Sequence, residues 1–141
     1  MVIEENVRCK LEAARVARLA TVSPKGAPHV IPVCFVFHGS VVYSAIDRKP
    51  KVTDPRQLVR ITNIETNPDV ALLVDEYDDD WEQLWYVLVR GKAGLVTAEV
   101  EHQLAVTRLQ AKYPQYSAGM LDVDALVLRI TPERITSWGN L

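Results

Sequence analysis

A short cationic segment is the feature of this sequence with the clearest chemical potential. Arg48, Lys49 and Lys51 fall within four residues, directly after a predicted strand that contains Ser44 and shortly before a predicted helix. A phosphate group binds where several fixed donors and positive charge converge, and arginine offers a planar fork while lysine offers a compact charge. The start of the following helix adds backbone N–H groups and a partial positive charge. The spacing therefore indicates a phosphate site, with a solvated surface loop as the plainer alternative.

Three aromatic residues, Trp81, Trp85 and Tyr86, form a second group of candidates. Large flat rings can stack on a flat heterocycle or fill a subunit interface, and the alternative is that they belong to the protein core. Because side chains alternate along a strand, Trp85 and Tyr86 are expected on opposite faces, so at most one of them faces the core. The other then needs a cover, which a ligand or a second subunit would supply.

Metal sites and nucleophilic catalysis find no support in the sequence. The acidic stretch at residues 75–80 lacks the glycine and terminal glutamate of a calcium loop, and His29, His38 and His102 are scattered. There is no GxSxG, Walker or Rossmann glycine pattern. We therefore expect no metal site and no catalytic triad.

Bulk composition indicates one ordinary domain. The chain has 141 residues, which is the usual size of a single domain spanning residues 1–141. Its formal net charge of -2 argues against a general nucleic-acid binder. No run approaches the roughly 20 apolar residues of a membrane span, and the first residues lack the apolar core of a signal peptide. We therefore expect a cytoplasmic protein that binds neither nucleic acid nor membranes.

Hydrophobic periodicity predicts a chain rich in strands. Helices are predicted at residues 3–15 and 98–112, and a third is predicted to start at Asp54-Pro55. Strands are predicted at residues 19–22, 29–37, 41–46, 70–74, 84–96 and 125–130, the last continuing through 134–138. Pro32 lies inside the second of these, which indicates an edge, a bulge or the approach of a ligand. Arg90-Gly91 interrupts the fifth and predicts a bulge.

The order of these elements predicts the fold class. Short turns join the first three strands into an antiparallel meander, and no alternation of strand and helix indicates a parallel sheet. Six antiparallel strands with peripheral helices predict a mainly β (α+β) fold built on a small barrel.

The segment from residue 19 to residue 51 resembles the opening meander of the pyridoxamine-phosphate-oxidase-like proteins, which share the FMN-binding split β-barrel. In that family a strand reading Leu-Ala-Thr, a turn with glycine, a proline-containing strand and a segment with Tyr-Ser/Thr and Arg-Lys follow in this order. The matching residues here are Leu19-Ala20-Thr21, Gly26, residues 28–32, Tyr43-Ser44 and Arg48-Lys49 with Lys51. Asn67-Pro68 and the late Trp138 also fit, so the resemblance covers nearly the whole chain.

Within this family the sequence most resembles the branch of probable enzymes that use the deazaflavin coenzyme F420. Lys49-Pro50-Lys51 and the segment that contains Trp81, Trp85 and Tyr86 carry this likeness. The resemblance implies a homodimer with a cofactor at the subunit interface. It also implies roles for individual residues: phosphate binding by Arg48, Lys49, Lys51 and Ser44, lining of the ring by the backbone of Ile31, Pro32 and Val33, and a contribution from the other subunit by Trp81, Trp85 or Tyr86.

Such a cofactor implies hydride transfer to or from a small organic substrate, and the protein then supplies binding, orientation and shielding from water. Arg56 and Arg60 are possible partners of the F420 tail, or belong to a solvated helix face. Three alternatives stay open: an oxidoreductase that uses FMN, a non-catalytic protein that binds a cofactor or haem with His29 as the axial ligand, and a structural dimer. The Arg-x-His pattern near the end of the vitamin-oxidising members is missing, so pyridoxamine-phosphate oxidation is not expected.

Overall fold

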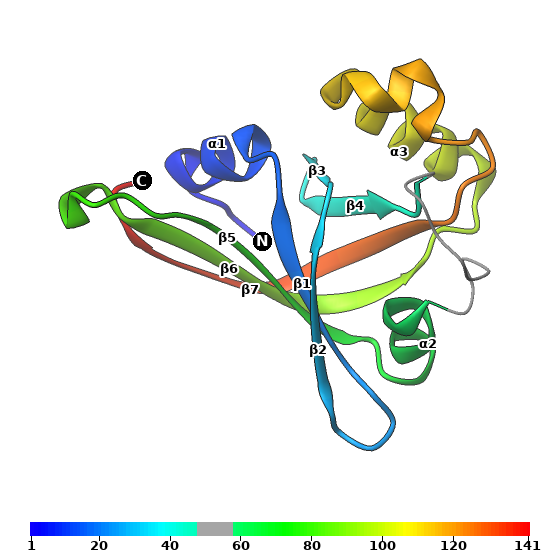
Figure 1. The fold of residues 1–141 in the computed structure, drawn as a ribbon, viewed down its shortest axis with the longest axis horizontal. Helices are drawn as coiled ribbons and strands as arrows, with labels where there is room; N and C mark the ends of the chain where they lie inside the picture. The colour runs from blue at the N-terminus through cyan, green and yellow to red at the C-terminus, as the bar shows by residue number, and fades with distance from the viewer. Residues whose placement is uncertain (48–57) are drawn as a thin grey trace.

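One curled antiparallel sheet organises the chain. A computed structural model describes residues 1–47 and 58–141. Over these residues the sheet has seven strands in the order β2-β1-β5-β6-β7-β4-β3 (Figure 1). The strands are β1 (Ala17–Val22), β2 (Pro28–Val33), β3 (Val36–His38), β4 (Val41–Ala45), β5 (Asp69–Glu76), β6 (Trp85–Leu95) and β7 (Val127–Gly139). The predicted antiparallel split barrel with peripheral helices is thus confirmed, with seven strands instead of six.

The seventh strand arises because the predicted strand 29–37 is two strands. β2 and β3 follow each other in the chain but lie at opposite edges of the sheet. The chain turns between them at Cys34 and Phe35, where side chains replace the ladder as hydrogen-bond partners. The Ser44 hydroxyl donates to the Cys34 carbonyl (2.7 Å), and the Phe35 N–H donates to the Tyr113 hydroxyl (3.0 Å). We call these two residues the β2–β3 corner.

Two prolines lie where a strand lacks a neighbour on one side, and one glycine lies where two backbones come very close. Pro28 and Pro32 lie on β2, which is an edge strand, as the sequence allows. The predicted irregularity in β6 is confirmed, because the register with β7 shifts between Arg90 and Gly91. Gly91 is needed there, since a Cβ would collide with the Thr131 carbonyl. Thr131-Pro132 does not end β7, because the pairing of β7 with β4 stops at Ile130 and leaves that side of the strand free.

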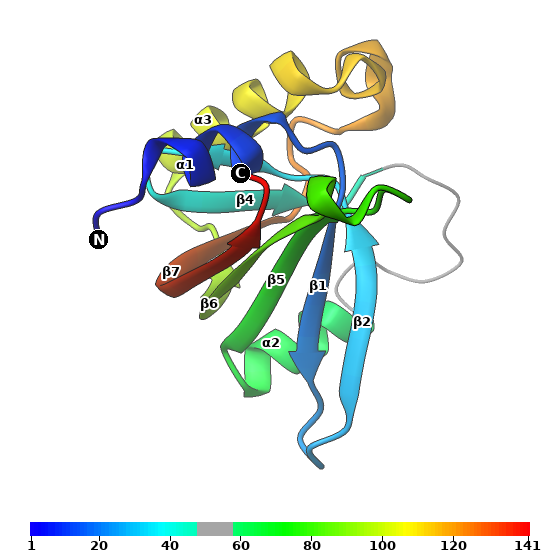
Figure 2. The same cartoon turned by 90° about the vertical axis from the view of Figure 1, so that its left-hand side faces the viewer.

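Helices cover the inner side of the curled sheet and part of its outer side. α1 (Glu5–Ala13) and α3 (Glu99–Lys112) lie toward one end and α2 (Val59–Thr66) toward the other (Figure 2). The predicted start of a helix at Asp54-Pro55 lies outside the described residues. A 3-10 turn η2 (Trp81–Gln83) and a π-type turn η3 (Tyr116–Met120) complete the described elements.

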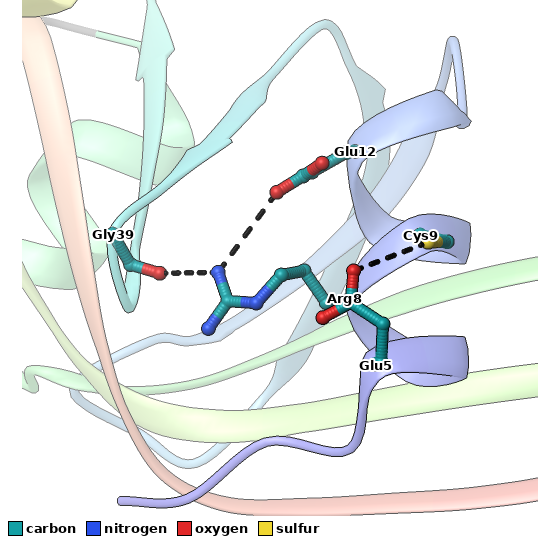
Figure 3. Close-up of polar contacts among 5 residues, drawn as sticks. All are labelled: Glu5, Arg8, Cys9, Glu12 and Gly39. Carbon is teal, nitrogen blue, oxygen red and sulfur yellow. Dashed lines mark hydrogen bonds and ion pairs between the residues drawn. The ribbon is translucent and has the colours of Figure 1, made fainter.

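The helix α1 docks through its buried apolar residues and one arginine. Val7 and Leu11 enter the main core together with Leu19, Leu72 and Val87. Figure 3 shows the Arg8 guanidinium reaching across to the turn between β3 and β4, where it donates to the Gly39 carbonyl (2.8 Å). Its carbon Cζ also lies 5.4 Å from the centre of the Phe37 ring.

The outer face of the sheet has two different halves. The covered half comprises β3, β4 and the start of β7, which pack through Val36, Tyr43 and Val127 against Leu109 of α3. The open half comprises β1, β2, β5, β6 and the end of β7, and no helix of residues 1–47 or 58–141 lies over it. It carries side chains from successive register pairs, namely Arg18, Val30, Pro32, Leu73, Tyr86, Leu88 and Trp138.

Candidate functional site

A pocket of about 280 Å³ lies between the end of the edge strand β2 and the end of β4. Its walls come from the end of β2, the β2–β3 corner, the end of β4 and the first turn of α2. They are mostly apolar, with two charged residues at one end; the lining residues are Val16, Pro32, Val33, Cys34, Ala45, Asp47 and Arg60. An apolar hollow with a few charged groups at one side suits a flat organic ligand that carries an anion.

The carboxylate of Asp47 accepts a hydrogen bond from Tyr116. The Tyr116 hydroxyl, at the start of η3, donates to Asp47 Oδ2 at 2.6 Å. The Tyr116 side chain is buried, and this burial together with the hydrogen bond to Asp47 strongly raises the pKa of its phenol. The phenol therefore stays protonated and remains a donor to Asp47 throughout the physiological pH range.

Arg60 supplies the positive charge of the pocket. It lies in the first turn of α2 and is half-buried. Burial lowers the pKa of its guanidinium, and the nearby Asp47 carboxylate acts in the opposite direction. An arginine remains charged at neutral pH in spite of such shifts. Arg60 thus offers a planar set of N–H donors at the charged end of an otherwise apolar hollow.

Of the residues predicted to bind phosphate, Arg48, Lys49 and Lys51 lie outside the described residues. They begin directly after Asp47, which lines the pocket. Ser44 is buried, and its hydroxyl hydrogen is directed to the Cys34 carbonyl. It therefore braces the β2–β3 corner, one residue behind the pocket wall.

Not all of the residues predicted to line a ring reach the pocket. Pro32 and Val33 line it. Ile31 lies on the same face of β2 as Val33 and packs against the main core. Ile31 thus contributes to the pocket only through the backbone that it shares with Pro32.

The three aromatic candidates lie away from the pocket of their own chain. Trp85 is a core residue, 7% exposed, whose Nε1 donates to Glu76 Oε2 (3.1 Å) and whose ring lies under the Lys10 ammonium. Tyr86 is 38% exposed on the opposite face and stacks on Trp138, with ring centres 6.1 Å apart. The expectation that only one of this pair faces the core is confirmed. Trp81 is 72% exposed on η2.

Residues in the pocket wall and behind it were missed in the sequence. Cys34 lies in an apolar run, which is typical of a buried residue, but it is half-buried in the pocket wall. Tyr116 lies behind the wall, in a segment whose sequence indicates only a short helical turn. Tyr113, next to it, accepts from the Phe35 N–H and donates to the Arg15 carbonyl (2.9 Å), which joins the two chain segments on either side of the pocket. Contacts of this kind, between residues about 80 to 100 positions apart, leave no local pattern.

Metal and haem ligands were also considered. Within the described part of the chain no group of three or more metal-ligating side chains comes together. His29 lies on the inner side of β2 opposite Thr21, and its Nδ1 is buried without a hydrogen-bond partner. It does not line the pocket described above. Among the described helices, none has the length and apolar character that crossing a membrane requires.

Comparisons with known proteins agree with this architecture. The sequence model of the family described as pyridoxamine 5'-phosphate oxidase matches residues 3–139. No curated protein matches the chain in sequence. Among solved structures, the protein Atu2129 of unknown function from Agrobacterium tumefaciens has a TM-score of 0.75 and 21% identity. That match covers 95% of this chain but only 55% of Atu2129, so the present chain spans about half the length of that relative.

Two further structural relatives have names that state a function. An F420 reductase superimposes with a TM-score of 0.68 and 23% identity, over 95% of this chain and 98% of the reductase. The haem storage protein HutZ from Vibrio cholerae superimposes with a TM-score of 0.72 and 19% identity, over 99% of this chain and 95% of HutZ. At these identities the likeness establishes the shared fold, and the functions of the two relatives differ.

Proposed function

Because the chain belongs to the pyridoxamine 5'-phosphate oxidase family, we propose that it is an oxidoreductase that uses the deazaflavin F420. The observation that carries this proposal is the juxtaposition of an apolar pocket, a charged Arg60 at its end and the cationic segment that begins directly after the pocket residue Asp47. FMN, which also carries a phosphate, is the alternative cofactor of the same site.

The donor set of the pocket fits a phosphorylated flavin-type cofactor. Pro32, Val33 and Ala45 offer apolar surface for a ring, and Arg60 offers charge for a phosphate. Arg48, Lys49 and Lys51 would add further positive charge. When bound, a deazaflavin supplies two-electron hydride transfer at its C5 position to or from a small organic substrate. The protein's own part is to bind and orient the two molecules and to exclude water.

We further propose that two copies of the chain form the complete site. The open half of the outer face exposes Val30 (60%), Tyr86 (38%) and Trp138 (53%), which is unusual for a surface that faces only water. Pro32 belongs to both this open half and the pocket wall. A second copy seated on the open half would therefore border the pocket, and its Trp81 or Tyr86 could then approach a bound ring. Such a dimer would act in the cytoplasm.

Titration of the full-length protein with F420 and with FMN tests the proposal, with the fluorescence of each cofactor as the readout. We expect saturable binding of F420 tighter than that of FMN. The double variant Lys49→Ala/Lys51→Ala should bind about 100-fold more weakly, because two charge-assisted contacts to phosphate are lost. The matched control is Lys25→Ala, which removes an exposed lysine from the turn between β1 and β2.

The outcomes of this titration distinguish the alternative functions of the pocket. Unchanged fluorescence with both cofactors would refute a flavin-type site. Tight binding without reduction of any candidate substrate would favour a non-catalytic carrier. A haem-binding function would instead appear as a shift and sharpening of the Soret band of added haem, lost in His29→Ala. The buried Nδ1 of His29, which lacks a hydrogen-bond partner, is the observation that motivates this measurement.

A further inference from the structure

We propose that Tyr116 is a positioning residue for anion recognition in this pocket: its hydroxyl holds the Asp47 carboxylate so that the charge of Arg60 stays available to an anionic ligand. The inference rests on the proposed function, because it takes the ligand's anion to be the phosphate of a flavin-type cofactor. It concerns a residue far from the cationic segment in sequence.

An unrestrained carboxylate beside an arginine would weaken an anion site. Asp47 and Arg60 both line the pocket, and Asp47 is close enough to act on the pKa of the Arg60 guanidinium. Carboxylates form bidentate pairs with arginine readily, and such a pair would occupy the donors that a phosphate needs. The ligand would then have to displace an internal competitor before it could bind.

Tyr116 is built to prevent this competition. Its ring is 3% exposed and packs against the Tyr113 ring, with ring centres 5.3 Å apart. A side chain fixed in this way can hold its hydroxyl at one place, and the hydroxyl meets Asp47 Oδ2 at 2.6 Å. A short hydrogen bond to a charged oxygen is among the stronger ones in proteins. Tyr116 therefore supplies a fixed contact that helps to direct the Asp47 carboxylate.

The neighbouring Tyr113 provides a matched comparison. Its hydroxyl binds the backbone of Phe35 and Arg15, next to the wall residues Cys34 and Val16. Removal of the Tyr113 hydroxyl should disturb the apolar wall of the pocket, whereas removal of the Tyr116 hydroxyl should disturb its charged end. The two tyrosines are three residues apart and are both buried, so their Phe variants carry similar risks for folding.

The experiment measures phosphate-specific affinity. Wild type, Tyr116→Phe and Tyr113→Phe are each titrated with FMN and riboflavin, and with F420 and its phosphate-free deazariboflavin core. In Tyr116→Phe we expect the preference for the phosphorylated ligand to fall about tenfold, with little change for the phosphate-free ligand. In Tyr113→Phe both members of each pair should weaken together. Circular dichroism and thermal unfolding check that each variant is folded.

A second background tests the competition directly. In Asp47→Asn the carboxylate charge is gone, so the preference for phosphate should rise, and adding Tyr116→Phe should then no longer lower it. If Tyr116→Phe weakens phosphorylated and phosphate-free ligands equally, or lowers the phosphate preference just as much in the Asp47→Asn background, the inference is wrong.

The role of Tyr116 can be tested even if the proposed function is refuted. If the wild type binds none of the four ligands, the function is refuted, and inorganic phosphate serves as the probe. Stabilisation of the wild type by phosphate in thermal unfolding, reduced in Tyr116→Phe and kept in Tyr113→Phe, would support the role of Tyr116 on its own. Absence of any phosphate effect on the wild type would overturn it.

Discussion

The strand β7 passes through two environments. Their difference separates the part of the protein that is packed in its own core from the part that we propose a second copy covers. At its start, Val127 and Leu128 point to opposite faces and both are buried, because α3 covers the outer side. At its end, Ser137 and Trp138 are both exposed, and the Trp138 ring stacks on that of Tyr86 on the neighbouring strand. The same strand is thus buried on both faces at one end and has an uncovered outer face at the other.

The largest expected difference between the two halves is in stability. Leu109→Ala removes a fully buried side chain of α3 from the covered half and should lower the free energy of unfolding by about 3 kcal/mol. Leu73→Ala makes the same chemical change on the open half, where the side chain is only partly buried, and should cost less than about 1 kcal/mol. Urea unfolding at a concentration where the protein is monomeric measures both.

Equal losses in these two variants would contradict the division into halves. A large loss for Leu73→Ala that appears only at high protein concentration would have a different meaning, since it would indicate that a second copy buries the open half.

Self-association should depend on the open half and not on the covered half. Tyr86→Ala/Trp138→Ala removes the stacked aromatic pair of the open half, and we expect the dissociation constant of the dimer to rise at least about 30-fold, as for a central aromatic contact of an interface. The matched control is Val100→Ala, because Val100 is 82% exposed on α3 and lies outside the open half. Sedimentation equilibrium measures both. An unchanged dissociation constant for the double variant would refute the open half as the interface.

The sequence predicted the faces of the open half better than it predicted the arrangement of the strands. The alternation of Trp85 and Tyr86 already indicated that one ring faces the core and the other needs a cover, and the structure confirms their opposite faces. The antiparallel split-barrel class also followed from the sequence. The predicted meander of the first three strands was wrong, because the chain breaks at Cys34 and Phe35 and its two parts belong to opposite sheet edges. An apolar run reads as one strand and gives no sign of such a break.

The candidate site was predictable only where its residues are neighbours in sequence. Pro32 and Val33 were expected next to a ligand and do line the pocket. The contacts of Tyr116 with Asp47 and of Tyr113 with Phe35 join the end of the α3 region to the first strands. A tyrosine in a short helical turn carries no local signal of such a partner, so only the tertiary structure identifies it.

A buried lysine and an exposed lysine extend the comparison to charged side chains, whose expected effect on stability is smaller. The Lys112 ammonium lies on the packed side, 4.1 Å from the centre of the Phe35 ring, and its nitrogen is buried without a hydrogen-bond partner. Burial, and next the nearby Arg15, lower its pKa to about 8. Lys92 is exposed on β6 just after the register shift at Gly91. Its ammonium pairs with Asp69, and this hydrogen bond raises the pKa of Lys92.

These opposite shifts predict opposite behaviour with pH. Folded Lys112 loses its proton near pH 8, whereas an unfolded lysine keeps its proton to about pH 10.4. Between these values the unfolded state binds more protons, so the free energy of unfolding should rise from pH 7.5 to 9.5, by about 1 kcal/mol once partial solvation is allowed for. Lys112→Met should remove this rise. Lys92→Met should leave it unchanged, because the raised pKa of Lys92 lies above this window. A rise of equal size in wild type and Lys112→Met would assign it to another group.

The smallest expected effect concerns α1, which packs on the inner side of the sheet against β3 of the covered half and β6 of the open half. Arg8 connects this helix to the turn between β3 and β4 through the Gly39 carbonyl and the Phe37 ring, whereas its ion pair with Glu12 is long, at 3.9 Å, and exposed (Figure 3). Arg8→Ala should therefore lower the free energy of unfolding by about 1 kcal/mol, and Glu12→Ala by less than about 0.3 kcal/mol. Hydrogen exchange should locate the loss in α1 and leave the amides of α3 protected. If Arg8→Ala instead speeds exchange in α3, the two sides of β3 and β4 are coupled, and the covered and open halves are not independent parts of the fold.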